Sequence, residues 1–324
     1  MNVTKFVFGS ELQGRGYATS RDLTVGFITT AVAMTALTGA IINIYLIKKL
    51  KVFHNAFGCF WGVRTIGELG NDTVFAFYTG PITILQPTNI PPEFGIFAYH
   101  FSFFFVCVQC AMNLVIALNR FVAVCYPVRY KFVFNKKVCL LAVGVVVVGS
   151  IFVVLLYFIF PCNHLGYSPR FYANVFIKCR GDLDRDYSQI SKFVYRICFS
   201  TACMGTAVIN SITFSKIVFI RLSSITTYNN KEFRRDVRLF TLAVVQDILM
   251  TIVGLVLIIT NNAKGLSVVG VLFSYDGLIF IYAFNTASMM FCNPECRRYL
   301  SSKLATSKPT VSTTLTSGQL ATSR

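Results

Sequence analysis

The chain has 324 residues, of which 55% are hydrophobic and only 13% charged, and its formal net charge is +17. A soluble globular domain carries about a quarter charged residues, so this composition argues strongly against a soluble domain. The apolar residues come in blocks that are long enough to cross a bilayer, which takes about 20 residues per helix. The basic residues are divided among several short segments, so we do not expect nucleic acid as a partner.

Seven apolar blocks follow one another along the chain: Leu23–Ile47, Phe57–Gly80, Phe94–Val124, Val138–Phe160, Ile190–Ser215, Leu239–Thr260 and Ser267–Phe291. They are too long for the strands of a membrane barrel, and backbone groups in lipid must be paired within the segment, so helices are expected. The predicted fold is an all-α integral membrane bundle of seven transmembrane helices over residues 23–291. The preceding residues, 1–22, are polar and show no cleavable leader, so the first span is expected to act as the targeting signal.

The distribution of Lys and Arg predicts the orientation of the bundle. Most of these residues lie in segments that are cytoplasmic if the N-terminus is outside and the C-terminus inside. They would then face anionic membrane lipid. Asn2 opens an Asn-Val-Thr tripeptide, a glycosylation acceptor that is useful only on the outside. Cys162 and Cys179 both fall in the second outer loop, where a disulfide between them can persist; two free thiols are the alternative.

The second block contains GVRTIGELGND, which places Arg64, Glu68 and Asp72 at four-residue intervals. In a helix this spacing puts the three side chains on one face. A charge that faces lipid costs about 2.5 to 3.5 kcal/mol, so this face is expected to look into the bundle, with Arg64 paired with Glu68. Other blocks offer polar residues to the same interior: Asn43, Asn113, Asn119, Asp247, Asp276 and Asn285. Two interpretations stay open, a static polar core or a network with two arrangements that a ligand biases.

The third block ends in NRFVAVCYPVRY, which begins at Asn119 and Arg120. This segment resembles the cytoplasmic end of the third helix in rhodopsin-like G-protein-coupled receptors, where an Asp/Glu-Arg-Tyr triplet is followed by a proline. More narrowly, FGCFWGVRTIGELGN, PCNHLGYSPRFY, SYDGLIFIYAFN and FCNPECRR are similar to the nematode serpentine chemoreceptors of class x. The resemblance runs from Gly39 to Leu300.

The resemblance implies a chemosensory receptor in the plasma membrane, at the cilium of a sensory neuron. It implies a small-molecule ligand in the outer half of the bundle, with these candidate contacts: Tyr99, Ser102, Val106, Arg196 and Asp276. Ordinary helix packing is the alternative for Tyr99 and Ser102, and an outward-pointing side chain is the alternative for Arg196. At the inner end the resemblance implies a heterotrimeric G protein, met by the basic third inner loop and by Asn119, Arg120 and Arg129.

The chain departs from the rhodopsin-like pattern at several positions. Asn119 replaces the acid of the triplet, so the ion pair that usually restrains Arg120 cannot form in its normal way. The outer end of the third block has no cysteine, which strengthens the pairing of Cys162 with Cys179. The sixth block has neither proline nor tryptophan, and Thr286 follows Asn285 where the family has proline.

The residues after the seventh block resemble the junction to a short amphipathic helix, which we expect over 292–300. Pro294 at a first helical position, followed by Glu295, suits a helix start. Cys292 and Cys296 are candidates for lipidation there. Residues 301–324 are rich in Ser and Thr and nearly free of apolar side chains, so a disordered cytoplasmic tail is expected.

A small-solute or proton-coupled transporter, or a ligand-gated channel, is the alternative function, since the intramembrane charges could relay protons or bind a substrate. Against a transporter, the sequence shows no internal repeat and no proline in the middle of a span. The three His residues have no metal-binding spacing and no nucleophile motif is present, so neither an enzyme nor a cofactor is expected. The sequence leaves open the ligand, the G-protein subunit and the formation of dimers.

Overall fold

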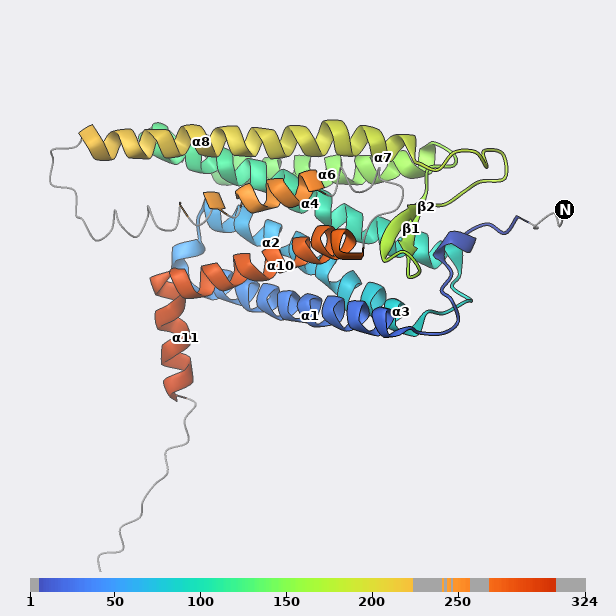
Figure 1. Ribbon diagram of the computed structural model, residues 1–324. Coiled ribbons are helices and arrows are strands. Elements are labelled where there is room, and N and C mark those ends of the chain that lie inside the picture. Colours follow the sequence, from blue (N-terminus) through green and yellow to red (C-terminus); the bar gives the residue numbers. More distant parts are fainter. Residues whose placement is uncertain (1–5, 224–240, 242–243, 246, 257–267, 307–324) are drawn as a thin grey trace, which may run out of the picture.

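The computed structural model describes residues 6–223, 241, 244–245, 247–256 and 268–306 (Figure 1). Its long helices run alongside one another in a bundle. The helical elements are η1 (Ser10–Leu12), α1 (Ser20–Lys49), η2 (Lys51–Phe53), α2 (Ala56–Val74), η3 (Phe75–Thr79), α3 (Gly80–Leu85), α4 (Pro92–Cys125), α5 (Tyr130–Val133), α6 (Lys136–Ile159), α7 (Gln189–Phe193), η4 (Val194–Phe199), α8 (Ser200–Ser223), α10 (Val268–Cys292) and α11 (Pro294–Thr306).

Four helical stretches among the described residues are long and apolar enough to cross a membrane. They are α1, α4, α6 and the run Gln189–Phe219, which combines α7, η4 and most of α8. The segments Asp247–Val256 and Asp276–Cys292 are shorter apolar helices. A mostly helical fold with several helices able to cross a membrane is therefore confirmed. The number of spans and the orientation of the termini stay predictions, because part of the sixth block lies outside the described residues.

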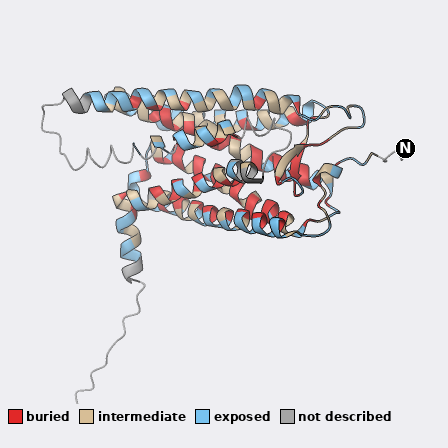
Figure 2. Cartoon of the chain, viewed as in Figure 1, coloured by how far each residue is buried: buried red, intermediate tan, exposed pale blue. Residues whose placement is uncertain are grey.

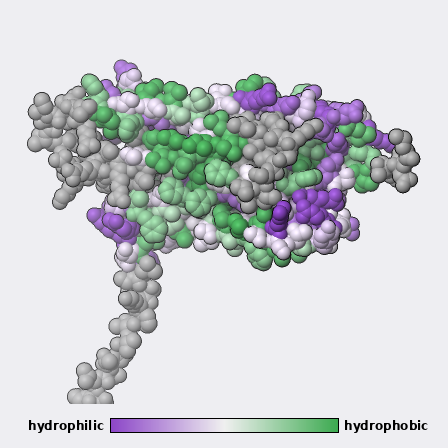
Figure 3. All heavy atoms as spheres, in the orientation of Figure 1, coloured by the Kyte–Doolittle hydropathy of each residue, from purple (hydrophilic) through white to green (hydrophobic). Residues whose placement is uncertain are grey.

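The interior of the bundle is formed by α2 and α4. Helix α2 packs against α1 and α4, and α4 packs in turn against α6 and α8. Buried residues line the faces that look inward, whereas the outward faces of α1 and α8 are largely exposed (Figure 2). Hydrophobic residues cover the middle of the surface shown in Figure 3, and hydrophilic ones gather towards its ends. On α6 the exposed side chains include Leu140, Leu141 and Val148, which suit contact with lipid.

Glycines in GVRTIGELGND allow α4 to lie close to α2. A Cβ atom on Gly70 would stand 2.3 Å from the ring of Phe105, and one on Gly67 would stand 2.9 Å from the carbonyl oxygen of Phe105. Any larger side chain would force the two helices apart. The same short segment therefore supplies both the buried charges and the close packing that encloses them.

The segment between α6 and α7 forms a β-hairpin, which corrects the expectation of an all-α fold. Strand β1 (Leu165–Ser168) pairs antiparallel with β2 (Ala173–Phe176). A disulfide joins Cys162 to Cys179 and closes the base of the hairpin, as predicted. Short aromatic and β-branched runs favour such strands, but four residues each give too weak a pattern to separate them from a loop.

Asp22 ties the hairpin to the N-terminal segment, to the start of α1 and to the end of α3. Its carboxylate accepts hydrogen bonds from Arg15 (2.8 Å), from the Gln86 amide (2.9 Å) and from the Tyr172 hydroxyl (2.6 Å). It also accepts from Thr19 in a capping box that begins α1. The N-terminal segment and the hairpin therefore lie together at one end of the bundle (Figure 1).

Helix α11 lies at the opposite end and turns away from the bundle (Figure 1). The side chain of Asn293 accepts a hydrogen bond from the backbone N–H of Glu295 at 3.0 Å, which caps the start of the helix. The helix continues to Thr306, past residue 300, where we expected it to end. Residues 307–324 and the predicted glycosylation site at Asn2 lie outside the described residues.

Candidate functional site

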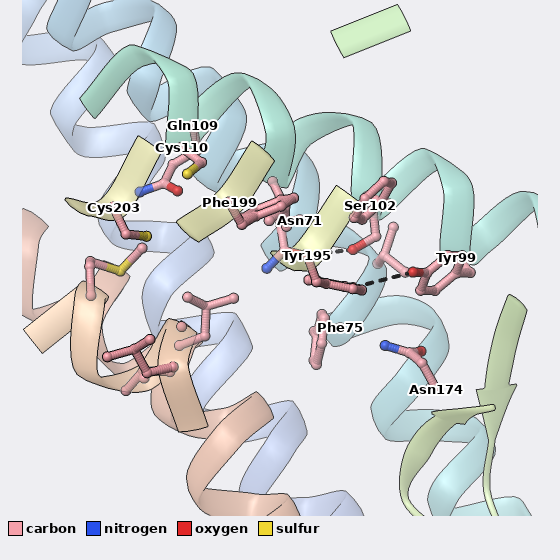
Figure 4. A pocket seen from close by; sticks show the side chains of 18 of the residues that line it. Asn71, Phe75, Tyr99, Ser102, Gln109, Cys110, Asn174, Tyr195, Phe199 and Cys203 are labelled. Carbon is pink, nitrogen blue, oxygen red and sulfur yellow. Dashed lines mark hydrogen bonds between the residues drawn. The ribbon is translucent and has the colours of Figure 1, made fainter. Parts of the chain in front are cut away.

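A cavity of about 100 Å³ lies beneath the hairpin, between the halves of the helices that are nearest to it. Its walls come from α2, η3, α4, η4, α8, α10 and the segment Asp247–Val256, with Tyr167 and Asn174 of the hairpin above. Three of the five residues predicted to face a ligand line it: Tyr99, Ser102 and Val106. All three lie on α4, and Figure 4 shows Tyr99 and Ser102 at the cavity wall. The family resemblance thus pointed to residues on the side of α4 that meets the cavity.

Two π-helical segments supply much of the aromatic wall. Phe75 and Tyr78 come from η3, and Tyr195 and Phe199 come from η4. A π turn holds one more residue than an α turn and so changes the direction of the side chains on that turn; such turns are frequent at functional sites. Neither segment contains a sequence signal that distinguishes it from an α-helix. These aromatic wall residues were therefore missed by the sequence analysis.

Polar side chains meet at the cavity wall in three places. The hydroxyl of Ser102 donates to Oδ1 of Asn71 at 2.6 Å, and the hydroxyl of Tyr282 donates to Oε1 of Gln109 at 3.5 Å. The hydroxyls of Tyr99 and Tyr195 are 3.4 Å apart (Figure 4). Asn71 and Gln109 were also missed. The signal available for each was a lone amide within an apolar run.

The structure places the other two predicted ligand contacts elsewhere. Arg196 is exposed on the outside of η4 and is not among the described residues that line the cavity. Asp276 of α10 is buried against α1, where its two oxygens accept from the Thr29 hydroxyl at 2.9 and 3.0 Å. It joins two helices and does not reach the cavity wall either.

The charged face of α2 looks into the bundle, as its spacing predicts. Nη2 of Arg64 lies 3.1 Å from Oε1 of Glu68, and both side chains are about 3% exposed. The amide of Asn285 on α10 also donates to Glu68, at 3.3 Å. Asp72 has no hydrogen-bond partner for either oxygen within the described part of the chain. Asn43 contacts Thr65 at 3.3 Å, so this residue joins α1 to α2.

A second buried ion pair lies towards the C-terminal end of α4. Nη1 of Arg120 stands 3.7 Å from Oδ2 of Asp247, and the same oxygen accepts from Asn210 of α8 at 2.6 Å. Arg120 therefore has an acidic partner on a different helix, although its neighbour is the neutral Asn119. The amide of Asn119 donates instead to the hydroxyl of Tyr130, at 3.1 Å.

The remaining predicted residues lie at the end of the bundle opposite to the hairpin. Arg129 is exposed in the connection between α4 and α5. Cys296 is fully buried in a cluster with Leu46, Phe60 and Met112, whereas Cys292 is half-buried. A buried thiol is a poor acceptor for an acyl chain, so Cys292 is the better placed of the two for lipidation.

Residues 33–293 match the model of a protein family described as "Serpentine type 7TM GPCR chemoreceptor Srx". The chain belongs to this family. The Srx family is a family of receptors rather than enzymes, and the apolar helices agree with a membrane protein that crosses the bilayer several times.

Shorter matches connect this Srx chain to vertebrate receptors. It is 34% identical over 76 residues to the human Olfactory receptor 8A1, which covers 21% of this chain and 23% of that protein. It is 40% identical over 52 residues to the human Olfactory receptor 10D3, which covers 16% of this chain and 17% of that protein. The chain spans about a fifth of the length of these curated relatives.

Proposed function

We propose that this Srx chain is a G-protein-coupled chemosensory receptor with seven spans, its N-terminus outside and its C-terminus in the cytoplasm. A small molecule binds in the cavity beneath the hairpin, and a heterotrimeric G protein binds at the inner ends of the helices. One observation carries the proposal. The helical segment Asp247–Val256 lines the cavity with Met250 and Val253, and its Asp247 pairs with Arg120.

This segment gives the ligand a direct mechanical connection to the inner end. Met250 lies three residues from Asp247, which is about one helical turn. A ligand that displaces Met250 or Val253 would move Asp247 with them. The Arg120–Asp247 contact, already 3.7 Å long, would then open and free the Arg120 guanidinium for the G protein. The ligand shifts the equilibrium only by its difference in affinity for the two arrangements.

The proposed coupling surface also includes Asn119, Arg129 and the basic loop after α8. That loop lies outside the described residues. Lipidation at Cys292 would fasten the start of α11 to the membrane surface. Localisation in a sensory cilium follows from the family pattern.

The proposal is tested by nucleotide exchange on a G protein with the full chain reconstituted in lipid. Asp247→Asn keeps the shape of the side chain but removes its charge, so we expect exchange without ligand to rise several-fold. Arg120→Ala removes the coupling cation, so exchange should fall to the level of empty vesicles. Equal exchange for the unaltered chain and both variants would contradict the proposal. The buried charges would then favour a transporter or a channel.

A further inference from the structure

We infer that the cavity takes an uncharged ligand with an acceptor oxygen, such as the carbonyl of a ketone, ester or lactone, on a mainly apolar body. The inference rests on the proposed function in one respect, because it treats the cavity as the ligand site. It goes further by giving the chemical class of the ligand.

Two buried amide groups at the cavity wall have donors to spare. The oxygen of Asn71 accepts from Ser102 and that of Gln109 accepts from Tyr282, so each amide has its acceptor in use. Nδ2 of Asn71 and Nε2 of Gln109 have no hydrogen-bond partner among the described residues. The two residues are 1% and 0% exposed. A buried donor without an acceptor costs about 1–3 kcal/mol, so an acceptor in the cavity that reaches either amide would stabilise it.

The two amides come from different helices, α2 and α4, and both line the same cavity (Figure 4). A water molecule can fill this role in the empty protein, since water accepts as well as donates. A carbonyl oxygen accepts two hydrogen bonds and donates none. It therefore matches groups that offer only N–H better than a hydroxyl or an amine does.

The described lining contains no Asp, Glu, Lys, Arg or His. The two charged residues that were predicted as ligand contacts add no charge to this lining, because Arg196 is exposed and Asp276 accepts a hydrogen bond from Thr29. A carboxylate or an ammonium ion would lose its hydration in the cavity without gaining a counter-ion, which is costly. Aromatic faces can attract a cation, but the two unpaired N–H donors would repel it. A neutral ligand is the class that remains.

The rest of the wall fits an apolar body. Phe75, Phe103 and Phe199 contribute rings, and Met204 and Met250 contribute flexible thioether side chains that adapt to irregular shapes. Small-molecule sites commonly combine a mostly apolar lining with a few polar groups that fix orientation. In this cavity Asn71 and Gln109 would fix the orientation of the ligand through its oxygen.

The test measures the thermal unfolding of the purified full chain in lipid nanodiscs with a panel of neutral ketones, esters and lactones. Each compound is paired with the alkane, the carboxylic acid and the amine of the same carbon skeleton, for example methyl hexyl ketone with octane, octanoate and octylamine. We expect the neutral carbonyl compounds to raise the unfolding temperature most. A larger shift with the acids or amines, or no shift with any carbonyl compound, would overturn the inference.

Two variants test the donors themselves. Asn71→Leu and Gln109→Met keep the approximate size of each side chain and remove the unpaired donor together with the acceptor that Ser102 or Tyr282 uses. Each variant should therefore lose some stability without ligand, and the effect of a compound is measured as the shift from the variant's own unfolding temperature. Each substitution should weaken the binding of the carbonyl compounds about tenfold, because one hydrogen bond to the ligand is lost. The binding of the alkanes should not change. Asn113→Leu is the matched control, because this amide lies one turn further along α4 and is not among the described lining residues. Equal carbonyl affinity in all three variants would contradict the role of the two amides.

These outcomes separate the ligand class from the proposed function. Binding of carbonyl compounds without nucleotide exchange on a G protein would support the ligand class and contradict the receptor proposal. Exchange driven only by charged compounds would support the receptor and overturn the ligand class.

Discussion

At the scale of single residues, the buried charges of α2 depend on one another. Arg64 and Glu68 are both buried, and Glu68 also receives a hydrogen bond from Asn285 on α10. The four-residue spacing was enough to predict the Arg64–Glu68 pair, because that contact lies within one helix. The partners Asn285 and Asp247 could not be derived in the same way, since they depend on how separate helices pack.

Glu68→Leu should leave the guanidinium of Arg64 buried without its acidic partner. Breaking a buried pair from one side costs about 3–5 kcal/mol, so we expect much less of the variant at the cell surface. Surface labelling against total protein measures this. The double variant Arg64→Leu with Glu68→Leu removes both charges and should recover part of the loss. Normal surface levels for Glu68→Leu alone would show that the pair does not support the fold.

At the scale of elements, the length of the apolar blocks decides most of the fold, while local deviations from regular helix decide the site. The predicted block Leu23–Ile47 lies within α1, and Phe94–Val124 lies within α4. The π-helical segments η3 and η4 and the hairpin could not be predicted, because each differs from its alternatives by only a few backbone angles. These irregular pieces supply part of the cavity wall, including Phe75, Tyr78, Tyr195 and Phe199, and those residues were the hardest to derive.

The contact between α2 and α4 provides a test with a control on the same helix. Gly70→Ala would place a Cβ atom 2.3 Å from ring atoms of Phe105, so the helices must separate and the chain should lose about 1–3 kcal/mol of stability. Gly62→Ala would place its Cβ atom 3.8 Å from Ile47, an ordinary contact, and should be neutral or slightly stabilising. Thermal unfolding in detergent compares the two variants. Equal unfolding temperatures would mean that the close approach at Gly70 does not limit stability.

At the scale of the whole molecule, the bundle has a closed end with the hairpin and an opposite end with α11, and buried polar residues lie between them. The end with the hairpin is closed by the disulfide and by the hydrogen bonds of Asp22, and the cavity lies beneath it. The other end carries Arg120 and α11. The segment Asp247–Val256 both lines the cavity and carries the acidic partner of Arg120. This arrangement is why we assign the segment the central part in signalling.

The most direct test of that account is calcium or cyclic-nucleotide imaging of cells that express the chain with a promiscuous G protein. The cells are exposed to a panel of volatile compounds and metabolites, with Arg120→Ala expressed at the same surface level beside the unaltered chain. We predict that at least one compound evokes a response and that the response disappears in Arg120→Ala. A response of equal size in the variant would contradict coupling through Arg120 and point to a channel or transporter.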